Sequence, residues 1–213
     1  MNRDEALKFI LTSKVIAVIR MADTEKLFKV TEAIKLGGVK AIEITMTTPN
    51  ALEVIRTMAQ KKSADVLIGA GTVLDAETAA AAIHAGADFV VSPITNSAMI
   101  RICRKYDKFV APGAFTPTEI VEAWETGADV VKVFPATSVG PKYFKDIKGP
   151  FPQIRLMPTG GVSIENAKDF IENGACCVAI GTALLDKKAI DNNDWGLLTQ
   201  KAKDLADSLA KFK

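Results

Sequence analysis

Short apolar runs alternate with longer amphipathic stretches along almost the whole chain. Each run holds five to eight residues and is bounded by glycine, proline or polar positions. Runs of this kind are typical of strands that are buried on both faces of a parallel sheet. Eight of them are predicted to be strands: residues 15–20, 41–45, 66–71, 89–93, 109–113, 129–136, 154–159 and 177–181.

The stretches between the strands are predicted to be helices. Asp23 is placed to cap a helix that continues to about Leu36, where Gly37-Gly38 ends it. Residues 2–13 form a further helix before the first strand. The other helices are expected to begin near Pro49, Asp75, Thr116, Pro141 and Ser163, with helical sequence at the end of the chain.

A repeated turn precedes every second strand and supports a count of eight strand-helix units. It occurs as Gly37-Gly38-Val39-Lys40, Ala85-Gly86-Ala87-Asp88, Thr126-Gly127-Ala128-Asp129 and Asn173-Gly174-Ala175-Cys176. The glycines at 38, 86, 127 and 174 are separated by 48, 41 and 47 residues, two strand-helix units each. This α/β pattern predicts a (β/α)₈ TIM barrel with an extra N-terminal helix, spanning residues 1–213 as a single domain.

A doubly wound open sheet is the alternative fold. Against it, Gly69-Ala70-Gly71-Thr72-Val73-Leu74 lacks the third glycine of the dinucleotide-binding fingerprint. We therefore expect no nucleotide cofactor.

Composition narrows the possible partners. The net charge is only +2, and no cluster of Lys and Arg is interleaved with aromatic residues, so nucleic acid is not expected as a partner. Lys61-Lys62 and Lys187-Lys188 are interpreted as solvated. The N-terminus is polar and no apolar run is long enough to span a membrane, so a cytoplasmic protein without a membrane partner is expected.

The cysteine content agrees with a cytoplasmic location, and the histidine content limits which catalytic mechanisms and metal sites are possible. Three cysteines without a C-x-x-C pair suit a reducing compartment. The only histidine, His84, lies in an alanine-rich helical stretch. A histidine-based mechanism and a multi-histidine metal site are therefore excluded, and neither a metal nor another cofactor is expected.

One lysine, Lys132, interrupts the apolar run at residues 129–136. Burial disfavours an ammonium, so the site either pairs the charge or lowers the pKa of the amine. A neutral, desolvated amine is a nucleophile for carbonyl carbon, as in Schiff-base enzymes. The alternative is a structural lysine that reaches water from the strand end or pairs with a buried carboxylate.

A carboxylate is predicted to lie near this lysine. Functional groups of such barrels gather at the C-terminal ends of the strands, where Glu43 and Thr45 share one side of their strand and Lys132 and Phe134 share one side of theirs. If that side is the interior, Glu43 and Lys132 meet inside an apolar barrel. Buried ion pairs are poor stabilisers, which favours a catalytic over a purely structural pair.

Two turns at the ends of the last strands predict an anion site. Thr159-Gly160-Gly161 and Gly181-Thr182 offer backbone N–H groups and hydroxyls before predicted helix N-termini, at the position where barrels of this class hold phosphate. Either turn alone could simply connect a strand to a helix. Two on adjacent strands favour a phosphate site.

The sequence resembles the 2-keto-3-deoxy-6-phosphogluconate (KDPG) and 4-hydroxy-2-oxoglutarate (KHG) aldolases over essentially its whole length. The motifs that carry the resemblance are Val18-Ile19-Arg20, Glu43-Ile44-Thr45, Gly69-Ala70-Gly71-Thr72-Val73, Val91-Ser92-Pro93, Val131-Lys132-Val133-Phe134-Pro135-Ala136 and Met157-Pro158-Thr159-Gly160-Gly161-Val162. The resemblance implies a class I aldolase, a homotrimer that acts on a small 2-keto acid.

The resemblance also implies roles for individual residues. Lys132 would form an imine with pyruvate and Glu43 would move protons. The pyruvyl pocket would be shaped by Arg20, Thr72, Pro93 and Phe134, and the phosphate would be held by Thr159, Gly160, Gly161, Gly181 and Thr182.

One position departs from the family pattern. Many members carry an arginine four residues after the glutamate, where it helps to hold the substrate carboxylate, and this chain has Thr47 there. Because a threonine cannot replace a bidentate carboxylate clamp, the departure bears on the exact substrate.

The expected reaction is cleavage of KDPG to pyruvate and glyceraldehyde 3-phosphate, with KHG as a further substrate that yields pyruvate and glyoxylate. The phosphorylated substrate is expected to be preferred because neither phosphate turn holds an arginine fork. Three alternatives stay open. They are an aldolase for a related 2-keto-3-deoxy sugar acid, a phosphosugar isomerase or epimerase, and a non-catalytic phosphosugar-binding barrel.

Overall fold

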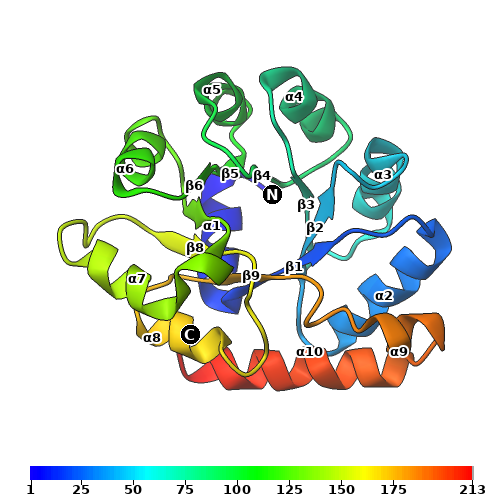
Figure 1. Cartoon of the computed structure of the whole chain (residues 1–213). Helices are drawn as coiled ribbons and strands as arrows, with labels where there is room; N and C mark the ends of the chain where they lie inside the picture. The colour runs from blue at the N-terminus through cyan, green and yellow to red at the C-terminus, as the bar shows by residue number, and fades with distance from the viewer. Residues whose placement is uncertain (213) are drawn as a thin grey trace.

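The strands curl into a barrel that is surrounded by helices (Figure 1). The computed structural model describes residues 1–212. All strand pairings are parallel, in the orders β5-β4-β3-β2-β1-β9 and β6-β7-β8. The strands are β1 (Val15–Ile19), β2 (Ala41–Thr45), β3 (Leu67–Gly71), β4 (Phe89–Val91), β5 (Phe109–Ala111), β6 (Gly113–Ala114), β7 (Val131–Val133), β8 (Leu156–Pro158) and β9 (Val178–Ile180).

The helices alternate with the strands, as the sequence pattern predicts. Asp23, Asp75 and Thr116 each cap a helix at the expected position with a side-chain oxygen. The helices are α1 (Arg3–Ser13), α2 (Thr24–Leu36), α3 (Ala51–Lys61), α4 (Ala76–His84), α5 (Ser97–Lys105), α6 (Pro117–Glu125), α7 (Gly140–Lys148), α8 (Ala167–Glu172), α9 (Lys187–Asp191) and α10 (Trp195–Leu209), with short 3₁₀ turns η1 (Ala136–Ser138) and η2 (Ala210–Phe212).

The barrel is closed by a break in the fifth predicted strand and by two bridges between β8 and β9. The fifth expected strand is broken at Pro112, so that β5 pairs with β4 and β6 pairs with β7. Proline lacks the N–H that a continuous ladder would need. Isolated bridges from Leu156 to Ala175 and from Thr159 to Ala179 join β8 to β9. The alternative of an open doubly wound sheet is therefore wrong.

One helix begins later than the sequence predicts. The chain from Ser163 to Asn166 forms a turn, and α8 starts at Ala167. The Ser163 N–H donates to Asn166 Oδ1 at 2.8 Å, and the Asn166 N–H donates back to Ser163 Oγ at 3.3 Å. These reciprocal bonds are those of a capping box, and the Ala167 N–H donates to the Ser163 carbonyl at 3.0 Å, so the turn at Ser163 leads into α8.

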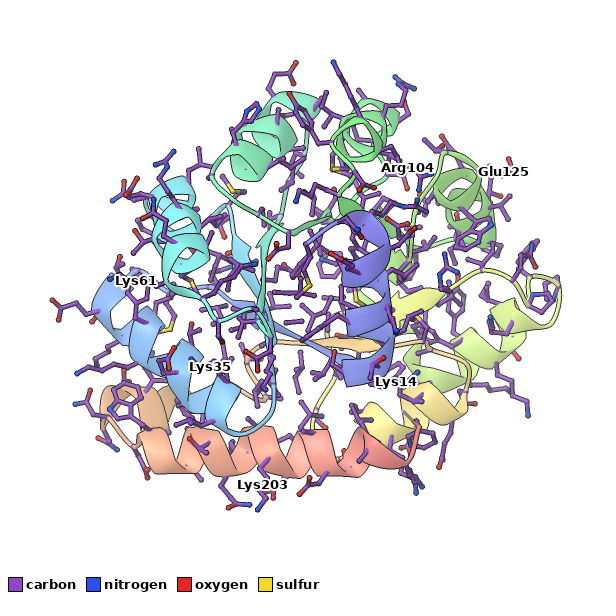
Figure 2. All side chains as sticks on the ribbon, turned by 180° about the vertical axis from the view of Figure 1, so that it is seen from behind. Lys14, Lys35, Lys61, Arg104, Glu125 and Lys203 are labelled. Atoms are coloured by element: carbon purple, nitrogen blue, oxygen red, sulfur yellow. The ribbon has the colours of Figure 1, made fainter. Side chains whose placement is uncertain are left out.

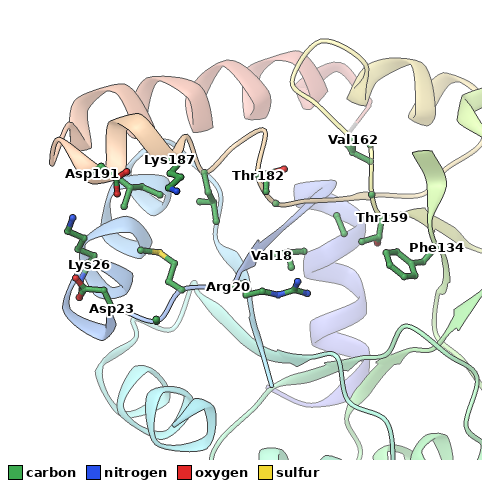
Figure 3. Close-up of a pocket in the computed structure, with 18 residues that line it drawn as sticks. Val18, Arg20, Asp23, Lys26, Phe134, Thr159, Val162, Thr182, Lys187 and Asp191 are labelled. Atoms are coloured by element: carbon green, nitrogen blue, oxygen red, sulfur yellow. The ribbon is translucent and has the colours of Figure 1, made fainter. Parts of the chain in front are cut away.

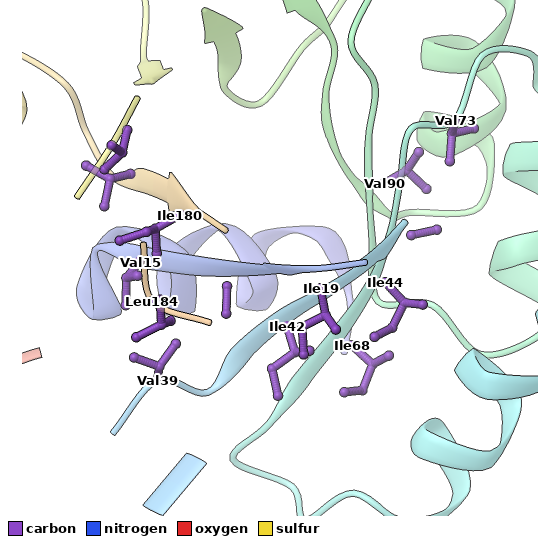
Figure 4. Close-up of a cluster of buried hydrophobic side chains, with 14 of the residues drawn as sticks. Val15, Ile19, Val39, Ile42, Ile44, Ile68, Val73, Val90, Ile180 and Leu184 are labelled. Carbon is purple, nitrogen blue, oxygen red and sulfur yellow. The ribbon is translucent and has the colours of Figure 1, made fainter. Parts of the chain in front are cut away.

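Apolar side chains fill both the barrel interior and the layer between the strands and the helices. Figure 4 shows part of the outer layer, where Ile42 and Ile44 of β2 lie near Ile19 of β1 and Ile68 of β3. The interior cluster takes the alternate positions: Ile16, Ala41, Leu67, Phe89, Val91, Phe109, Ala111, Val130, Met157, Cys177 and Ala179.

This alternation fixes where the two key side chains lie. Glu43 comes two residues after the interior residue Ala41, and Lys132 comes two residues after the interior residue Val130. Successive side chains of a strand point to opposite faces, so both side chains face the interior. They lie closer to the C-terminal ends of their strands than Ala41 and Val130 do.

Helix α1 closes the N-terminal end of the barrel. Seen from behind in Figure 2, it lies across the strands, and it buries Ala6 and Ile10 against the interior cluster. Arg3 Nε donates to the buried Asp129 carboxylate at 2.6 Å, and the amino group of Met1 pairs with Asp88 at 2.9 Å. With this end sealed, access to the interior is left to the C-terminal ends of the strands.

None of the helices within residues 1–212 is long and apolar enough to cross a membrane.

Candidate active site

Lys132 occupies the middle of β7 and is almost completely buried. Its side chain is 5% exposed, and its backbone N–H donates to the Pro112 carbonyl at 2.8 Å. The Nζ atom lies 5.0 Å from the centroid of the Phe134 ring, so the two side chains share one face of the chain as the sequence predicts. Burial lowers the pKa of the Lys132 amine, the nearby Glu43 carboxylate raises it, and Arg20 lowers it further. Desolvation is the largest of the three effects, and it favours the neutral, nucleophilic amine.

Glu43 lies on the opposite side of the barrel, in the middle of β2, and is 1% exposed. Burial raises the pKa of its carboxyl group, although Lys132 and Arg20 both act to lower it. Within residues 1–212, its Oε2 atom has no hydrogen-bond partner. A buried structural ion pair would satisfy both carboxylate oxygens, so the free oxygen favours a group that meets a substrate.

A glycine of the next strand makes room for this carboxyl group. The Glu43 side chain packs on the backbone of Gly71, where an added β-carbon would overlap Oε1. In the register of the sheet, Glu43 is opposite Gly69 and Thr45 is opposite Gly71. Gly69 and Gly71 therefore place no side chain of β3 beside the carboxylate. The sequence did not predict that Gly71 makes room for Glu43.

A cavity of about 750 Å³ opens at the C-terminal ends of β1, β7, β8 and β9 (Figure 3). Phe134 lines it and connects it to Lys132, whose amine lies against the same ring. Seven of the predicted site residues line this one cavity: Arg20, Phe134, Thr159, Gly160, Gly161, Gly181 and Thr182.

The other four predicted residues lie outside the lining of the cavity. Lys132 and Glu43 are buried within the barrel, as described above. Thr72 follows β3 with a left-handed backbone, φ 58°, and Pro93 lies after β4 against Gly113. A threonine in this conformation is strained, and such strain is often found near functional sites.

The backbone shape of the loop after β8 depends on two adjacent glycines. Gly160 and Gly161 both have left-handed backbones, φ 86° and 73°, which only glycine adopts without strain. Asn166 donates to the Gly161 carbonyl at 2.9 Å, and Gly161 packs directly on Thr137. The Thr159 hydroxyl is buried and has no hydrogen-bond partner among the described residues. An unpaired buried hydroxyl beside this loop is a ready partner for a ligand.

The two turns predicted to hold phosphate differ from the sequence prediction in one respect. The sequence predicts that they lead directly into helices whose N-termini attract the anion. Instead α8 begins only at Ala167 and α9 at Lys187, several residues after Gly161 and Thr182. The donors available to an anion are therefore loop N–H groups and hydroxyls.

Thr47 stands where the family resemblance implies an arginine, so this position carries no cation. Its hydroxyl lies 3.0 Å from that of Thr45, at the end of β2. Arg20, which follows β1, lines the cavity, and its charge lowers the pKa of both Glu43 and Lys132.

Sequence reasoning missed four charged residues that line the outer part of the cavity: Asp23, Lys26, Lys187 and Asp191. The interpretation of Lys187 as a solvated residue without a role is incomplete, because its side chain faces this cavity. Only its place five residues after Thr182 could have drawn attention to it.

Fold and site together define a class of protein. A (β/α)₈ barrel that buries one lysine of lowered pKa opposite a carboxyl group, below a cavity lined by glycine and threonine turns, is an enzyme scaffold for imine chemistry on carbonyl compounds.

Comparison with known proteins gives the family. Residues 7–201 match the model of the family described as KDPG and KHG aldolase. The chain is 35% identical over 203 residues to the 2-dehydro-3-deoxy-phosphogluconate aldolase of Pseudomonas aeruginosa, covering 94% of this chain and 91% of that protein. It is 30% identical over 206 residues to the KHG/KDPG aldolase of Escherichia coli K12, covering 96% of each. The chain therefore belongs to the KDPG and KHG aldolase family, and it is an aldolase, a lyase.

A solved structure of the family has the same fold. The KDPG aldolase of Legionella pneumophila, with pyruvate captured as a covalent carbinolamine intermediate, superposes with a TM-score of 0.86 at 30% identity, covering 93% of this chain and 97% of that one. In that relative pyruvate is bound covalently.

Proposed function

We propose that this enzyme cleaves KDPG to pyruvate and glyceraldehyde 3-phosphate through an imine on Lys132. The observation that carries the proposal is the burial of Lys132 in an apolar barrel, against Phe134 and across from Glu43. A lysine of lowered pKa presents a neutral amine to the C2 carbonyl of a 2-keto acid.

The reaction begins with attack of the Lys132 amine on C2. The carbinolamine that forms loses water and gives a protonated imine. When the C3–C4 bond breaks, its electron pair moves into the imine and leaves an enamine, while the proton of the C4 hydroxyl goes to a base and glyceraldehyde 3-phosphate departs. The enamine takes a proton at C3, and water then releases pyruvate. The imine serves as the electron sink.

Glu43 is the group proposed to carry these protons. Burial shifts the pKa of the Glu43 carboxyl group upward, in the direction of neutral pH. A carboxyl group with such a pKa can both accept and donate a proton during the reaction. Its unpartnered Oε2 leaves one oxygen available for a substrate hydroxyl or a bridging water.

The remaining residues are proposed to position the substrate. Arg20 holds the carboxylate in place of the arginine that Thr47 replaces, and Thr72, Pro93 and Phe134 shape the pyruvyl pocket. The distal phosphate binds to the loop N–H groups and hydroxyls of the two turns: Thr159, Gly160, Gly161, Gly181 and Thr182. A three-oxygen dianion suits these donors better than the planar carboxylate of KHG, which an arginine fork would hold. KDPG is therefore the proposed preferred substrate.

The experiment is release of pyruvate, measured with coupled lactate dehydrogenase, on KDPG, its dephosphorylated form and KHG. The expected order of kcat/KM has KDPG first, and activity is expected to survive EDTA. Conversion of a phosphosugar without pyruvate would favour an isomerase or epimerase. Binding without turnover would favour a non-catalytic barrel.

We further propose a homotrimer in the cytoplasm, with the chain acting as a single barrel domain. Three large apolar side chains, Leu74, Ile94 and Phe115, are 48, 47 and 38% exposed where the chain leaves β3, β4 and β6. Exposed apolar groups on neighbouring loops suit a subunit interface. Three free cysteines, two of them adjacent in sequence, suit a reducing compartment. Sedimentation equilibrium gives the mass of the assembly, and Ile94→Asp is expected to weaken it.

A further inference from the structure

The outer part of the cavity holds two lysines that come from different elements. Lys26 is in the first turn of α2, and Lys187 is the first residue of α9. Figure 3 shows Lys187 between Asp191 and Thr182, and Lys26 beside Asp23. Neither lysine is part of the barrel interior, and the mechanism proposed above uses neither of them.

The ammonium groups of both lysines lack an ion-pair or hydrogen-bond partner among the described residues. By contrast, Lys35 of α2 pairs with Glu32 at 2.7 Å. On the α9 side, Lys201 pairs at 2.9 Å with Asp186, the residue that caps α9. The charge of Lys187 is therefore available to a ligand in the cavity.

The phosphate turns provide donors but no formal charge. Loop N–H groups and the hydroxyls of Thr159 and Thr182 are neutral, whereas a phosphate monoester carries nearly two negative charges at neutral pH. Removing such a dianion from water into a partly apolar cavity is costly unless a cation faces it. Besides Arg20, which lies toward the catalytic end, Lys26 and Lys187 are the cations that line this cavity.

We propose that Lys187 is a specificity-determining residue that selects substrates with a dianionic distal group, with Lys26 in a supporting role. The inference rests on the proposed function and deepens it, because it names the enzyme side chain whose charge distinguishes the distal phosphate of KDPG from the distal carboxylate of KHG.

Lys187 is favoured over Lys26 by its place in the chain. It follows the Gly181-Thr182 turn by five residues, and the cap formed by Asp186 with the Ala189 N–H at 3.1 Å anchors its helix. Leu185 and Ile190, on either side of it in sequence, also line the cavity. Each lysine has a carboxylate nearby, Asp23 beside Lys26 and Asp191 beside Lys187, so the preference rests on the closeness of Lys187 to the Gly181-Thr182 turn.

Two carboxylates also lie in this region. Asp23 and Asp191 line the same space as the lysines and lower the positive potential near both of them. The two substrates are separated by their own charge, because a phosphate dianion gains more from the potential of Lys187 than a singly charged carboxylate does.

The test compares Lys187→Gln with Lys188→Gln, a control that removes the adjacent exposed lysine, whose side chain does not line the cavity. Lys187→Gln is expected to lower kcat/KM for KDPG by about 10-fold or more, as for a lost charge-assisted hydrogen bond, while kcat/KM for KHG changes by less than about 3-fold. Lys188→Gln is expected to leave both values unchanged. Equal losses on the two substrates, or the same result for both variants, would overturn the proposal.

A binding measurement tests the role of Lys187 independently of the proposed aldol cleavage. Inorganic phosphate, titrated calorimetrically into the enzyme, is expected to bind about 10-fold more weakly to Lys187→Gln than to the wild type or to Lys188→Gln. If the wild type released no pyruvate but showed this pattern, the reaction would be wrong and the role of Lys187 would stand. If the wild type released pyruvate while the three proteins bound phosphate equally, the role of Lys187 would be wrong.

Discussion

The carboxyl group of Glu43 packs on the α-carbon of Gly71, in space that any side chain at position 71 would occupy. The buried carboxyl group can therefore occupy this position only because residue 71 of the neighbouring strand has no side chain. Substitution of that glycine tests whether the position of Glu43 matters for catalysis.

Gly71→Ala is expected to displace the Glu43 side chain and to lower kcat by about 10²-fold or more, since a misplaced proton-transfer group loses most of its effect. The matched control is Gly196→Ala in the first turn of α10, where a β-carbon would meet only ordinary contacts. Steady-state pyruvate release from both variants, with circular dichroism to verify folding, makes the comparison. Full activity of Gly71→Ala would show that the close packing has no catalytic role.

Glu43→Gln keeps the size of the side chain and removes its acid-base function. We expect kcat to fall by roughly 10² to 10⁴-fold while the fold is retained. The measurement is steady-state pyruvate release together with the midpoint of thermal unfolding. Near-normal turnover would mean that Glu43 and Lys132 form a structural pair.

The pH dependence of imine formation reports on the pKa of Lys132, because only the neutral amine attacks a carbonyl. Glu43 raises this pKa and Arg20 lowers it. Glu43→Gln is therefore expected to shift the midpoint of the rate of imine formation to lower pH, and Arg20→Leu to shift it to higher pH. Borohydride trapping after short incubation with pyruvate at a series of pH values gives both midpoints. Shifts in the same direction would contradict the charge arrangement.

Thr182→Val removes one hydroxyl from the second phosphate turn and preserves the shape of the side chain. The expected loss is about 1 to 3 kcal/mol in transition-state binding of KDPG, with little change for its dephosphorylated form. Part of this loss should appear in kcat, because binding of the remote phosphate helps to place C2 against Lys132. Equal losses on both substrates, measured as kcat/KM, would assign Thr182 to the scaffold.

The sequence was sufficient to single out the two charged groups that the structure buries inside the barrel. Lys132 and Glu43 stand out because each is a charged residue in a short apolar run. Strand alternation put them on the same sides of their strands as Phe134 and Thr45, and the structure shows that the side chains of Glu43 and Lys132 face the interior. The repeated glycine turns predicted the number of units, and the side chains of Asp23, Asp75 and Thr116 predicted where three helices begin.

Features that depend on contacts distant in the sequence could not be predicted in this way. The space that Gly71 leaves for Glu43 depends on the register between β2 and β3. The approach of Lys187 to the cavity depends on the path of the chain between β9 and α9. The exact start of α8 is also difficult to predict, because residues 164–166 form a turn before the regular helix although Ser163 and Asn166 make the reciprocal bonds of a capping box.

Covalent trapping on Lys132 is the most direct measurement of the central claim. The enzyme is incubated with pyruvate and sodium borohydride, digested, and examined by mass spectrometry, with Lys132→Arg and the wild type without pyruvate as controls. Reduction of an imine is expected to leave a pyruvate-derived adduct on Lys132 alone, absent from both controls, with loss of activity in proportion to the modification. An unmodified Lys132 in an enzyme that still releases pyruvate, or equal labelling of the Lys132→Arg variant, would contradict the imine mechanism.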